Sequence, residues 1–492
     1  MRPLAVAAPS REAADAAEAI ARAGGSAVDA AIAAALVAMV TEVGLVSLSS
    51  GGFVAVQPAT GSAYTVDGWM DRPGVGRTPD APAPDTWDVS TEYGGGVGIT
   101  IGAGSVATHG SLAAFGEAHA RDGRLPWAEL VGPATDVARG GFALGSASRY
   151  YLRYVHESIF GWDAASHAAL HDAAGRLTED RVVVADLAAT LEQIATDGPR
   201  ALHEGDLADA IAADVVARGG LLGRADLAAY APVVREPLTT RVAGWSLATT
   251  TPPSVGGVVL AAMLRLLEDR PRGPWDADDV EHLVRVQRAV LGHRRDVLEV
   301  AADLPAAARA WLDRVDADHR AVLESGSTAH VSVTDADGAA CSLTVSSGYG
   351  SGMIAAGTGI WLNNCLGEQE LNPPGRDVAP GSRLLSNMAP VVGRHDDGST
   401  LAIGSPGADR ITTAVVCALA GFVNGGLDLE DAVAHPRVHV HHAGLPDEDV
   451  RREEGLTMYF GGVGAALTRA DGSLEAVADP RREGVGRVVR PD

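Results

Sequence analysis

The residue pattern changes once along this chain, near position 327, and that change limits the fold more than any other feature. Between residues 110 and 323, apolar and charged residues mostly recur at helical spacing. After Ser327, short β-rich runs alternate with Gly, Asp and Asn turns, and one helix is expected among them, at 412–424. The two regions meet in GSTAHVSVTDADG, a small-residue turn that enters a strand. The sequence therefore predicts a helical region followed by a region of short strands.

The first 70 residues predict two helices and a β-hairpin. Residues 10–23 alternate Ala with charged residues and end at Gly24-Gly25, a helix-stop signal. Residues 28–40 form a nearly all-apolar helix that must be buried on most sides. Because Glu42 interrupts the apolar run, a buried helix followed by a strand fits it better than a membrane span. The hairpin is formed by GGFVAVQP and SAYTVDGW.

Composition excludes several classes of protein. With 492 residues, of which 46% are apolar, the chain can bury a large core. The net charge of −24 argues against nucleic acid or an anionic membrane as partner. The apolar patch before Pro9 is too short for a signal peptide, so we expect a cytoplasmic protein. The three cysteines lack the spacing of a disulfide framework or a zinc site; they are Cys341, Cys365 and Cys417.

One glycine pattern resembles a cofactor site. In ITIGAGSVATHG, the residues Gly102, Gly104 and Ala107 precede a helix expected at 111–120, as in a dinucleotide-binding turn. The acidic residue expected about 20 positions later is missing, because RDGRLPWAEL begins another helix there. The pattern therefore favours a tight turn with close backbone packing over a nicotinamide site.

Histidine and cysteine residues offer two other candidate sites. His439 and His441 share one face of a strand in HPRVHVHH, a spacing that can bind a transition metal. No Cys or carboxylate cluster accompanies them, so a half-exposed polar strand is the preferred interpretation. Cys365 could be a thiol nucleophile, but without a visible basic partner a buried, inert cysteine is preferred.

Thr328 opens the strand in STAHVSVTD and is the candidate nucleophile. A threonine hydroxyl needs a base, and the α-amino group of an N-terminal threonine can supply one, with a pKa of roughly 7.7–8 in model peptides. Thr328 would reach that state by attacking the carbonyl of Ser327, which gives an ester that water hydrolyses. From these residues alone, an ordinary turn-to-strand entry stays open.

An ordered series of sequence blocks resembles the γ-glutamyltranspeptidases, a family of N-terminal-nucleophile hydrolases. Before residue 328 the blocks are GGSAVDAAIAAAL, SSGGFVAV, GSVATHGSLAAF, DGRLPWAELVGPA, YAPVVREPL and TTPPSVGGVVLAAML. From residue 328 they are TAHVSVTDADGAACSLT, GTGIWLNN, RLLSNMAP, GSPGADRITT, YFGG and DPRREG. The resemblance covers nearly the whole chain, and so many matches in order are specific for the superfamily.

The resemblance implies an α+β fold, a four-layer αββα sandwich, self-cleaved into a large chain, 1–327, and a small chain, 328–492. It implies a small-molecule substrate and no cofactor, metal, nucleic acid or membrane partner. The large and small subunits of one precursor would be each other's partners, and a homodimer of processed units is left open.

The resemblance also implies roles for individual residues. Thr328 matches the family nucleophile. Ser346 matches a hydroxyl residue that hydrogen-bonds the new amino terminus. Gly407 and Ala408 match the glycine pair of the oxyanion hole, and because backbone N–H groups do that work, alanine is permitted there.

The chain departs from the family where the family holds its glutamyl substrate. The corresponding positions are Trp69, Cys365, Glu368, Ser386 and Asn387, with Arg72 close to the first but out of register. Trp69 replaces an arginine that clamps a carboxylate, and tryptophan cannot imitate that bidentate pair. Glu368 keeps a negative charge, whereas Cys365 replaces neither an amide nor a carboxylate. Around Gly348 the loop is about two residues shorter than in the family, and an asparagine contact is lost.

Acyl transfer through Thr328 is therefore expected, while γ-glutamyl recognition is in doubt. The leading hypothesis is a hydrolase that cleaves an amide or related acyl bond through an acyl-Thr328 intermediate, in specialised metabolism. Its superfamily relatives include acylases and enzymes that hydrolyse carbon–carbon bonds beside an activated carbonyl. A true γ-glutamyl hydrolase or transpeptidase acting on glutathione-like substrates and an uncleaved, non-catalytic homologue are the alternatives.

Overall fold

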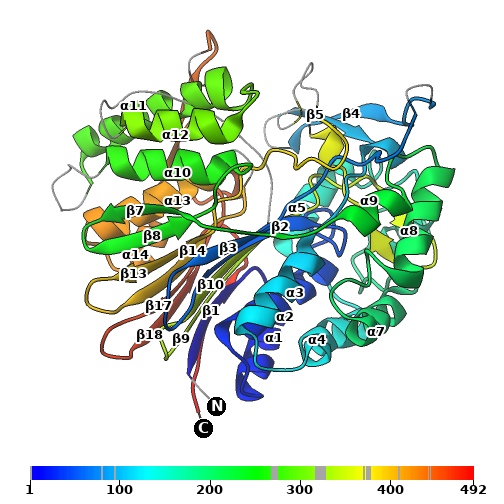
Figure 1. Cartoon of the computed structure of the whole chain (residues 1–492), viewed down its shortest axis with the longest axis horizontal. Coiled ribbons are helices and arrows are strands. Elements are labelled where there is room, and N and C mark those ends of the chain that lie inside the picture. The colour runs from blue at the N-terminus through cyan, green and yellow to red at the C-terminus, as the bar shows by residue number, and fades with distance from the viewer. Residues whose placement is uncertain are drawn as a thin grey trace.

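The computed structural model describes residues 3–78, 81–93, 96–267, 275–315, 329–368, 372, 378–407, 410–441, 443 and 445–491. Two β-sheets pack face to face, and helices cover both outer faces (Figure 1). This is the expected α+β architecture of four layers. Ser327, Thr328 and Ala408 lie outside the described residues.

The first sheet has seven strands in the order β19-β1-β9-β10-β2-β3-β6, and all neighbours are antiparallel. Its strands are β1 (Leu4–Ala8), β2 (Gly51–Gln57), β3 (Tyr64–Gly68), β6 (Val233–Arg235), β9 (Ala329–Asp335), β10 (Ala340–Ser346) and β19 (Val485–Val489). β9 therefore lies inside the sheet, between the first strand of the chain and β10.

The second sheet has six antiparallel strands in the order β18-β17-β14-β13-β8-β7. They are β7 (Leu238–Val242), β8 (Trp245–Thr249), β13 (Val391–His395), β14 (Thr400–Gly404), β17 (Gly464–Thr468) and β18 (Leu474–Ala478). β9 and β10 face β14 across the sandwich. Separate two-stranded pairs join β4 (Trp87–Thr91) to β5 (Val97–Ile101), β11 (Ile354–Ala355) to β12 (Ile360–Trp361) and β15 (Val438–His441) to β16 (Asp449–Arg452).

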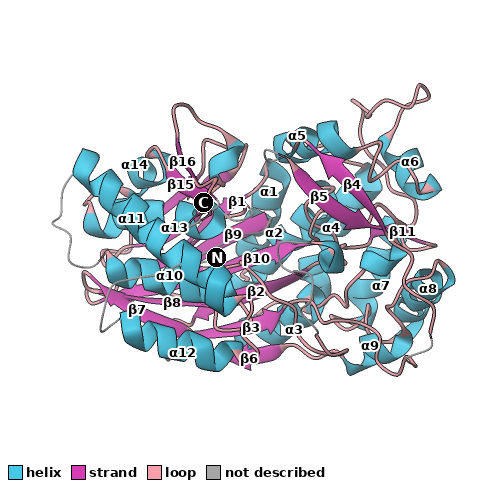
Figure 2. Cartoon of the chain, turned by 90° about the horizontal axis from the view of Figure 1, so that it is seen from above, coloured by secondary structure: helices cyan, strands magenta, loops and turns pink. Residues whose placement is uncertain are grey.

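Helices form the two outer layers (Figure 1). The first sheet is covered by α1 (Arg11–Arg22), α2 (Ala27–Thr41), α3 (Ser111–Asp122) and α4 (Trp127–Gly140). The second sheet is covered by α10 (Val255–Leu266), α11 (Ala277–His293), α12 (Leu304–Val315), α13 (Arg410–Leu419) and α14 (Leu429–Ala434). Beside the first layer lie the β4–β5 pair and α5 (Ser146–Val155), α6 (Ala164–Leu170), α7 (Leu187–Asp197), α8 (Gly205–Ala217) and α9 (Arg224–Ala229) (Figure 2).

The two N-terminal helices confirm the sequence prediction. Ser10 caps α1 by accepting the N–H of Ala13 at 3.2 Å. Ser26 and Asp29 form a capping box at the start of α2. Every residue of α2 is buried, because the helix lies between α1, α4 and the outer face of β9 and β10. The predicted hairpin is β2–β3, and the predicted C-terminal helix begins at Arg410 and ends as a π-turn at Ala420–Asn424.

The expectation of mostly helical structure up to residue 323 is wrong for residues 233–249. β7 and β8 form a hairpin there, joined by Ala243 and Gly244, whose φ angles are +47° and +84°. Positive φ at both central residues is the type I′ geometry that follows the natural twist of a hairpin. An Ala-Gly pair is a weak turn signal, so the surrounding helical pattern concealed it.

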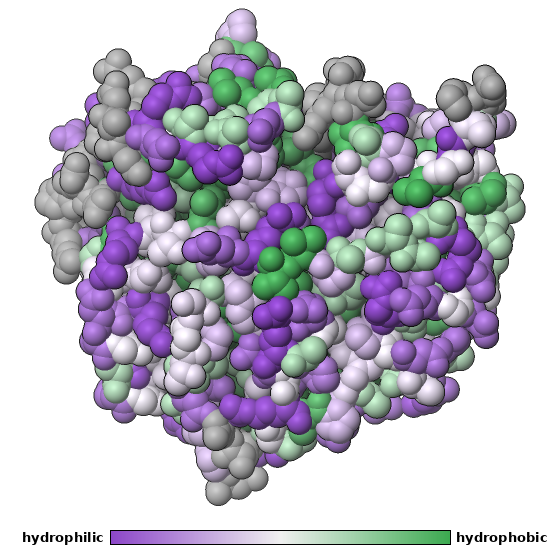
Figure 3. Space-filling model, viewed as in Figure 1, coloured by the Kyte–Doolittle hydropathy of each residue, from purple (hydrophilic) through white to green (hydrophobic). Residues whose placement is uncertain are grey.

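The molecular surface is mainly hydrophilic on the face shown in Figure 3. Figure 3 shows one face, on which hydrophilic side chains predominate and hydrophobic ones form small separate groups. Among the helices of the described residues, none combines the length and the apolar character needed to cross a bilayer.

Candidate active site

The candidate site is built around the start of β9. Ala329, the residue after Thr328, pairs with Val345 of β10. The next β10 residue is Ser346, which is 1% exposed and whose Oγ accepts the N–H of Gly348 at 2.9 Å. Gly348 has φ +67°, so the chain turns sharply away from the strand there. Ser346 therefore ends β10 one residue beyond the partner of Ala329, with its hydroxyl oxygen bonded to a backbone N–H.

His330 lies two positions after Thr328 and is a structural residue. Ser332 donates its hydroxyl to the Gly464 carbonyl at 3.1 Å, so its oxygen accepts from His330 Nε2–H at 2.8 Å. The Thr344 hydroxyl is then the donor to Nδ1, also at 2.8 Å. Burial lowers the pKa of His330 to about 3. The imidazole is therefore neutral, both ring nitrogens are bonded within the first sheet, and the ring packs against Gly404 of the second sheet.

Trp69 lies next to Ser346 across β2. Gly51 pairs with Ser346, and a Cβ at Gly51 would lie 3.0 Å from the Trp69 indole. The indole stacks on Phe53, with ring centroids 6.5 Å apart, and donates Nε1–H to the Leu385 carbonyl at 2.7 Å. Only 1% of Trp69 is exposed. Its single polar donor is therefore used by the protein itself.

Arg72 lies in the turn that follows Trp69. Its backbone bonds Ser382 and Gly381, at 2.9 and 2.7 Å, and its side chain is half-buried. The cation near this turn is Arg383, which binds Asp67 and Asp71. Burial works against the charge of Arg383, but Tyr230, Asp67 and Asp71 outweigh it and raise its pKa. Arg383 is thus held by protein carboxylates.

Ser386 and Asn387 lie directly after the Leu385 carbonyl that binds Trp69. Both are buried, with 0% and 3% exposed. The Asn387 Oδ1 accepts a hydrogen bond from Arg294, while Nδ2 has no partner among the described residues. Trp69, Ser386, Asn387 and Arg294 are called the Trp69 cluster below.

Arg294 was missed by sequence reasoning. It starts the π-turn after α11, is 0% exposed, and forms an ion pair with Glu299 at 2.7 Å. It reaches Asn387 from 93 positions away in the sequence. Nothing in LGHRRDVLEV distinguishes it from a surface arginine, so only the fold reveals it.

Glu368 lies next to the turn at Gly348, and Cys365 lies next to Glu368. A Cβ at Gly348 would lie 3.0 Å from Glu368 Oε1. Burial, and then the neighbouring Glu368, raise the pKa of the Cys365 thiol well above its usual range. A thiol held protonated in this way is a poor nucleophile, which agrees with the interpretation of Cys365 as inert.

The predicted oxyanion loop follows β14. Gly407 has φ +133°, and a Cβ there would lie 2.8 Å from the Gly461 Cα. Both the conformation and the close approach require glycine. Arg410, at the start of α13, donates its N–H to the Gly407 carbonyl at 3.0 Å. Gly407 thus lies between the end of β14 and the start of α13, with its carbonyl bonded by Arg410.

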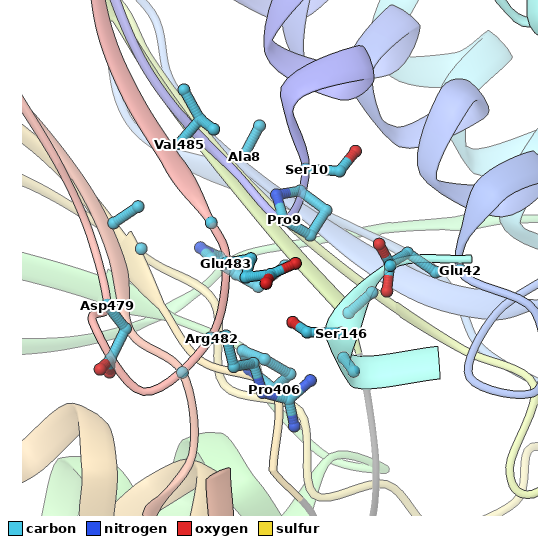
Figure 4. A pocket seen from close by; sticks show the side chains of 18 of the residues that line it. Ala8, Pro9, Ser10, Glu42, Ser146, Pro406, Asp479, Arg482, Glu483 and Val485 are labelled. Carbon is cyan, nitrogen blue, oxygen red and sulfur yellow. The ribbon is translucent and has the colours of Figure 1, made fainter. Parts of the chain in front are cut away.

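A cavity of about 360 Å³ opens beside the start of β9, on the side where β1 lies (Figure 4). Ala329 and Pro406 contribute to its wall, so it reaches the neighbours of Thr328 and of Gly407. Glu42 and Arg482 also line it. This space is called the Glu42 cavity below. The sequence did contain a signal for it, since Glu42 is the acid that interrupts an apolar run.

Comparison with known proteins decides the family. The family model described as Gamma-glutamyltranspeptidase matches residues 13–489. The chain belongs to the γ-glutamyltranspeptidase family.

Its similarity to individual members of the family extends over almost the full length. It is 30% identical over 544 residues to the glutathione hydrolase proenzyme of Pseudomonas aeruginosa, covering 99% of this chain and 95% of that protein. It is also 30% identical over 507 residues to the acylase ACY 1 proenzyme of Pseudomonas sp. (strain SE83), covering 94% and 89%. The crystal structure of cephalosporin acylase from Bacillus halodurans shares the fold, with a TM-score of 0.78 at 21% identity over 99% and 96% of the two chains. This γ-glutamyltranspeptidase-family protein is therefore an enzyme.

The glycine pattern at 102–107 is a tight turn in this γ-glutamyltranspeptidase-family chain. Gly102 has φ +98°, and a Cβ there would lie 2.6 Å from the Trp87 ring. A Cβ at Gly104 would lie 2.6 Å from Pro84. Close packing therefore accounts for both glycines, as expected.

The histidine strand differs from its prediction. β15 is mostly buried, with His439 0% exposed and its Nδ1 3.2 Å from the Thr413 hydroxyl. The expectation of a half-exposed strand is wrong because β16 and α11 cover it. Within the ranges that the structure describes, no three His, Cys, Asp or Glu side chains gather as a metal site would require.

Proposed function

We propose that this protein cleaves itself between Ser327 and Thr328 and then hydrolyses an amide or related acyl bond of a small molecule through an acyl-Thr328 intermediate. The products of self-cleavage are a large subunit, 1–327, and a small subunit, 328–492. The observation that carries the proposal is the family match over residues 13–489, which spans both subunits and their junction.

Self-cleavage needs no outside reagent except water. The Thr328 hydroxyl oxygen bonds to the Ser327 carbonyl carbon as the peptide C–N bond breaks, and the freed nitrogen gains the hydroxyl proton. Water then hydrolyses the ester, which leaves a carboxylate on Ser327 and a free hydroxyl and amine on Thr328. The same two groups perform turnover: the amine takes the hydroxyl proton during attack and passes it to the leaving nitrogen. Water finally releases the acyl group as an acid.

The surroundings of β9 support the α-amino group as the base. His330 is neutral with both ring nitrogens bonded, so it has no free position for a proton from Thr328. The buried, protonated thiol of Cys365 does not compete as a nucleophile. Ser346 follows the β10 partner of Ala329, which supports its role beside the new amino terminus.

The oxyanion is assigned to the backbone N–H groups of Gly407 and Ala408. The φ of +133° at Gly407 and its close approach to Gly461 support a defined backbone conformation at Gly407. Rigid N–H donors stabilise a developing negative charge without reorganising during the reaction.

The Trp69 cluster supports a substrate other than a γ-glutamyl compound. The Trp69 Nε1–H is already donated to Leu385, and Arg294 is ion-paired with Glu299. The Asn387 Nδ2 has no acceptor among the described residues, and as a neutral amide it suits a neutral carbonyl or hydroxyl better than a carboxylate. Substrates are therefore sought among acyl amides of specialised metabolism, with Glu368 and Ser386 as further polar contacts.

A denaturing gel and two substrates test this function. The wild-type protein should give two fragments in place of the 50.3 kDa chain, and the Thr328→Ala variant a single band. The wild type should hydrolyse neutral acyl-p-nitroanilides faster than γ-glutamyl-p-nitroanilide. A single wild-type band after long incubation would indicate a non-catalytic homologue, and a preference for the γ-glutamyl substrate would restore glutathione-like specificity.

A further inference from the structure

The loop after β14 runs through Ser405, Pro406 and Gly407. Gly407 is buried, and its N–H has no acceptor among the residues that the structure describes. A buried backbone N–H is ordinarily hydrogen-bonded, because leaving it without a partner costs free energy. The Gly407 N–H is therefore available to donate to a bound molecule.

The Ser405 hydroxyl is hydrogen-bonded in two directions. It donates to the Pro406 carbonyl at 2.6 Å and accepts the N–H of Gly462 at 3.0 Å. Only 1% of Ser405 is exposed, so solvent does not compete for these two bonds. The hydroxyl thus links the loop after β14 to residues 459–463, which are called the 459–463 segment below.

The Pro406 carbonyl and the Gly407 N–H belong to the same peptide group. Because a peptide group is planar, the direction of its carbonyl sets the direction of its N–H. A hydrogen bond to the carbonyl also polarises the group, which makes its N–H a stronger donor. The bond from Ser405 therefore acts, through one peptide group, on the N–H that is assigned to the oxyanion.

Gly461 provides the space in which these contacts form. It has φ +88°, and a Cβ there would lie 2.8 Å from the Ser405 Oγ, 2.9 Å from the Ala414 Cβ and 3.2 Å from the Pro406 carbonyl oxygen. A Cβ at Gly407 would in turn lie 2.8 Å from the Gly461 Cα. A side chain at Gly461 would therefore displace the loop after β14 or the helix α13.

The 459–463 segment is bonded to charged side chains on its other side. Val463 donates its N–H to the Asp479 carboxylate at 2.6 Å, and the Phe460 carbonyl accepts from Arg437 at 2.8 Å. Asp479 and Arg437 form an ion pair at 2.6 Å, and 1% of each side chain is exposed. The Gly462 N–H that binds Ser405 therefore comes from a segment with hydrogen-bonded residues on both sides of Gly462.

We propose that Ser405 is a positioning residue for the oxyanion. Its hydroxyl, bonded by Gly462, orients the Pro406–Gly407 peptide so that the Gly407 N–H points at the acyl oxygen in the transition state. Gly461 keeps free the space that this arrangement needs. This role rests on the proposed function, because it requires an acyl-Thr328 intermediate, and Ser405 acts through the Gly407 N–H without touching the reacting atoms.

Steady-state kinetics of Ser405→Ala on an acyl-p-nitroanilide tests this role, with turnover expressed per cleaved chain. We expect kcat to fall at least about tenfold while KM changes less than about threefold, because the Gly407 N–H meets a full negative charge only in the transition state. A loss that appears only in KM would contradict the role, because it would place Ser405 in substrate binding.

Ser342→Ala is the matched control. The Ser342 hydroxyl is also buried and also donates to a backbone carbonyl, that of Ile403 at 3.0 Å, but it does not bond the peptide of Gly407. This variant should keep kcat within about twofold of the wild type. Wild-type kcat in Ser405→Ala, or an equal loss in both serine variants, would overturn the proposal.

Two glycine variants test the same contact without removing the hydroxyl. Gly461→Ala places a methyl group against Ser405 and should also lower kcat at least about tenfold. Gly472, in the turn between β17 and β18, has φ +83° and nothing within 4 Å of an added Cβ. Gly472→Ala should therefore leave kcat within about twofold, because it strains only that turn. An equal loss in both glycine variants would overturn the role of Gly461.

The behaviour of the wild type separates failure of this role from failure of the proposed function. A wild-type protein that stays a single chain without turnover contradicts both. A wild type that is cleaved and active, with Ser405→Ala equally active, contradicts only the role of Ser405. If Ser405→Ala does not fold, the comparison of Gly461→Ala with Gly472→Ala decides.

Discussion

The two sides of the β9 start differ in how their buried polar groups are satisfied. In the Trp69 cluster, Trp69 binds Leu385, and Arg294 binds Glu299 and Asn387. In the Glu42 cavity, Glu42 and Arg482 face space without described partners. Buried groups with protein partners stabilise a fold, whereas buried charges without them indicate a ligand. The difference teaches that charged groups near the start of β9 are paired within the protein in the Trp69 cluster and are unpaired in the Glu42 cavity.

The largest expected effect is the loss of turnover when Thr328 is replaced. Thr328→Ala should lower turnover by about 10⁴-fold, because nucleophile and base are lost together. Thr328→Ser, which keeps a hydroxyl and can expose an amine, should keep measurable activity. Steady-state kinetics on a common acyl-p-nitroanilide measures both.

Thr400→Ala is the matched control for that loss. Thr400 is buried in β14, and its hydroxyl has no partner among the described residues. This variant should therefore keep wild-type turnover. If the Thr328→Ala and Thr400→Ala proteins had equal activity, Thr328 would not be the nucleophile.

The Trp69 cluster is tested next by breaking its ion pair. Arg294→Met should reduce the free energy of unfolding by about 3–5 kcal/mol, because Glu299 is left without its charged partner. Urea denaturation measures this loss. Adding Glu299→Gln should recover part of it, since the unpaired charge is then removed. A single variant as stable as the wild type would show that the pair is not part of the fold.

The raised pKa of Glu42 predicts that the stability of the protein depends on pH. The pKa of Glu42 is about 7 in the folded protein against 4.5 for an ordinary glutamate. Between these values the folded state binds the extra proton, so stability falls as pH rises from about 4.5 to 7, by about 3 kcal/mol in total. Arg482, Glu12 and Glu483 are the charges that act on this group. Glu42→Gln should remove that part of the slope, and an unchanged slope between pH 4.5 and 7 would contradict the assignment.

The smallest expected effect concerns Trp69 itself. Trp69→Phe keeps an aromatic ring against Phe53 but leaves the Leu385 carbonyl without its donor. We expect a loss of about 1–2 kcal/mol in unfolding free energy, measured by chemical denaturation. Phe53→Leu, which removes the stack and keeps the hydrogen bond, separates the two contributions. No loss in Trp69→Phe would show that the indole N–H is available to a substrate.

Much of the fold was predictable where the local pattern is strong. α1 and α2 follow from their spacing and stop signals, and β2–β3 from its alternation. The β7–β8 hairpin was missed because its turn is Ala-Gly and its strands lie in a helical region. Strands such as β1 and β19 are five residues long, and each is recognisable only by its partner at the opposite end of the chain.

The candidate site was predictable only in part. The family resemblance indicated Trp69, Ser386 and Asn387 as substrate contacts, which stays a prediction. The structure shows that the Trp69 indole donates to the carbonyl of Leu385, the residue before Ser386. Arg294 could not be found, because its partner Asn387 is 93 residues away and no local pattern distinguishes it. Glu42 was visible as a lone acid in an apolar run, but its meaning depends on Arg482, which is 440 positions away and lines the same cavity only in the folded chain.

The central claim is that Thr328 becomes an amino terminus. N-terminal sequencing of the purified wild-type protein, with intact mass measurement of every fragment, tests it directly. We predict a small subunit that begins Thr-Ala-His-Val, in equal amount to a large subunit that ends at Ser327. Protein that stays a single chain, or a fragment that begins at any other residue, would contradict the account.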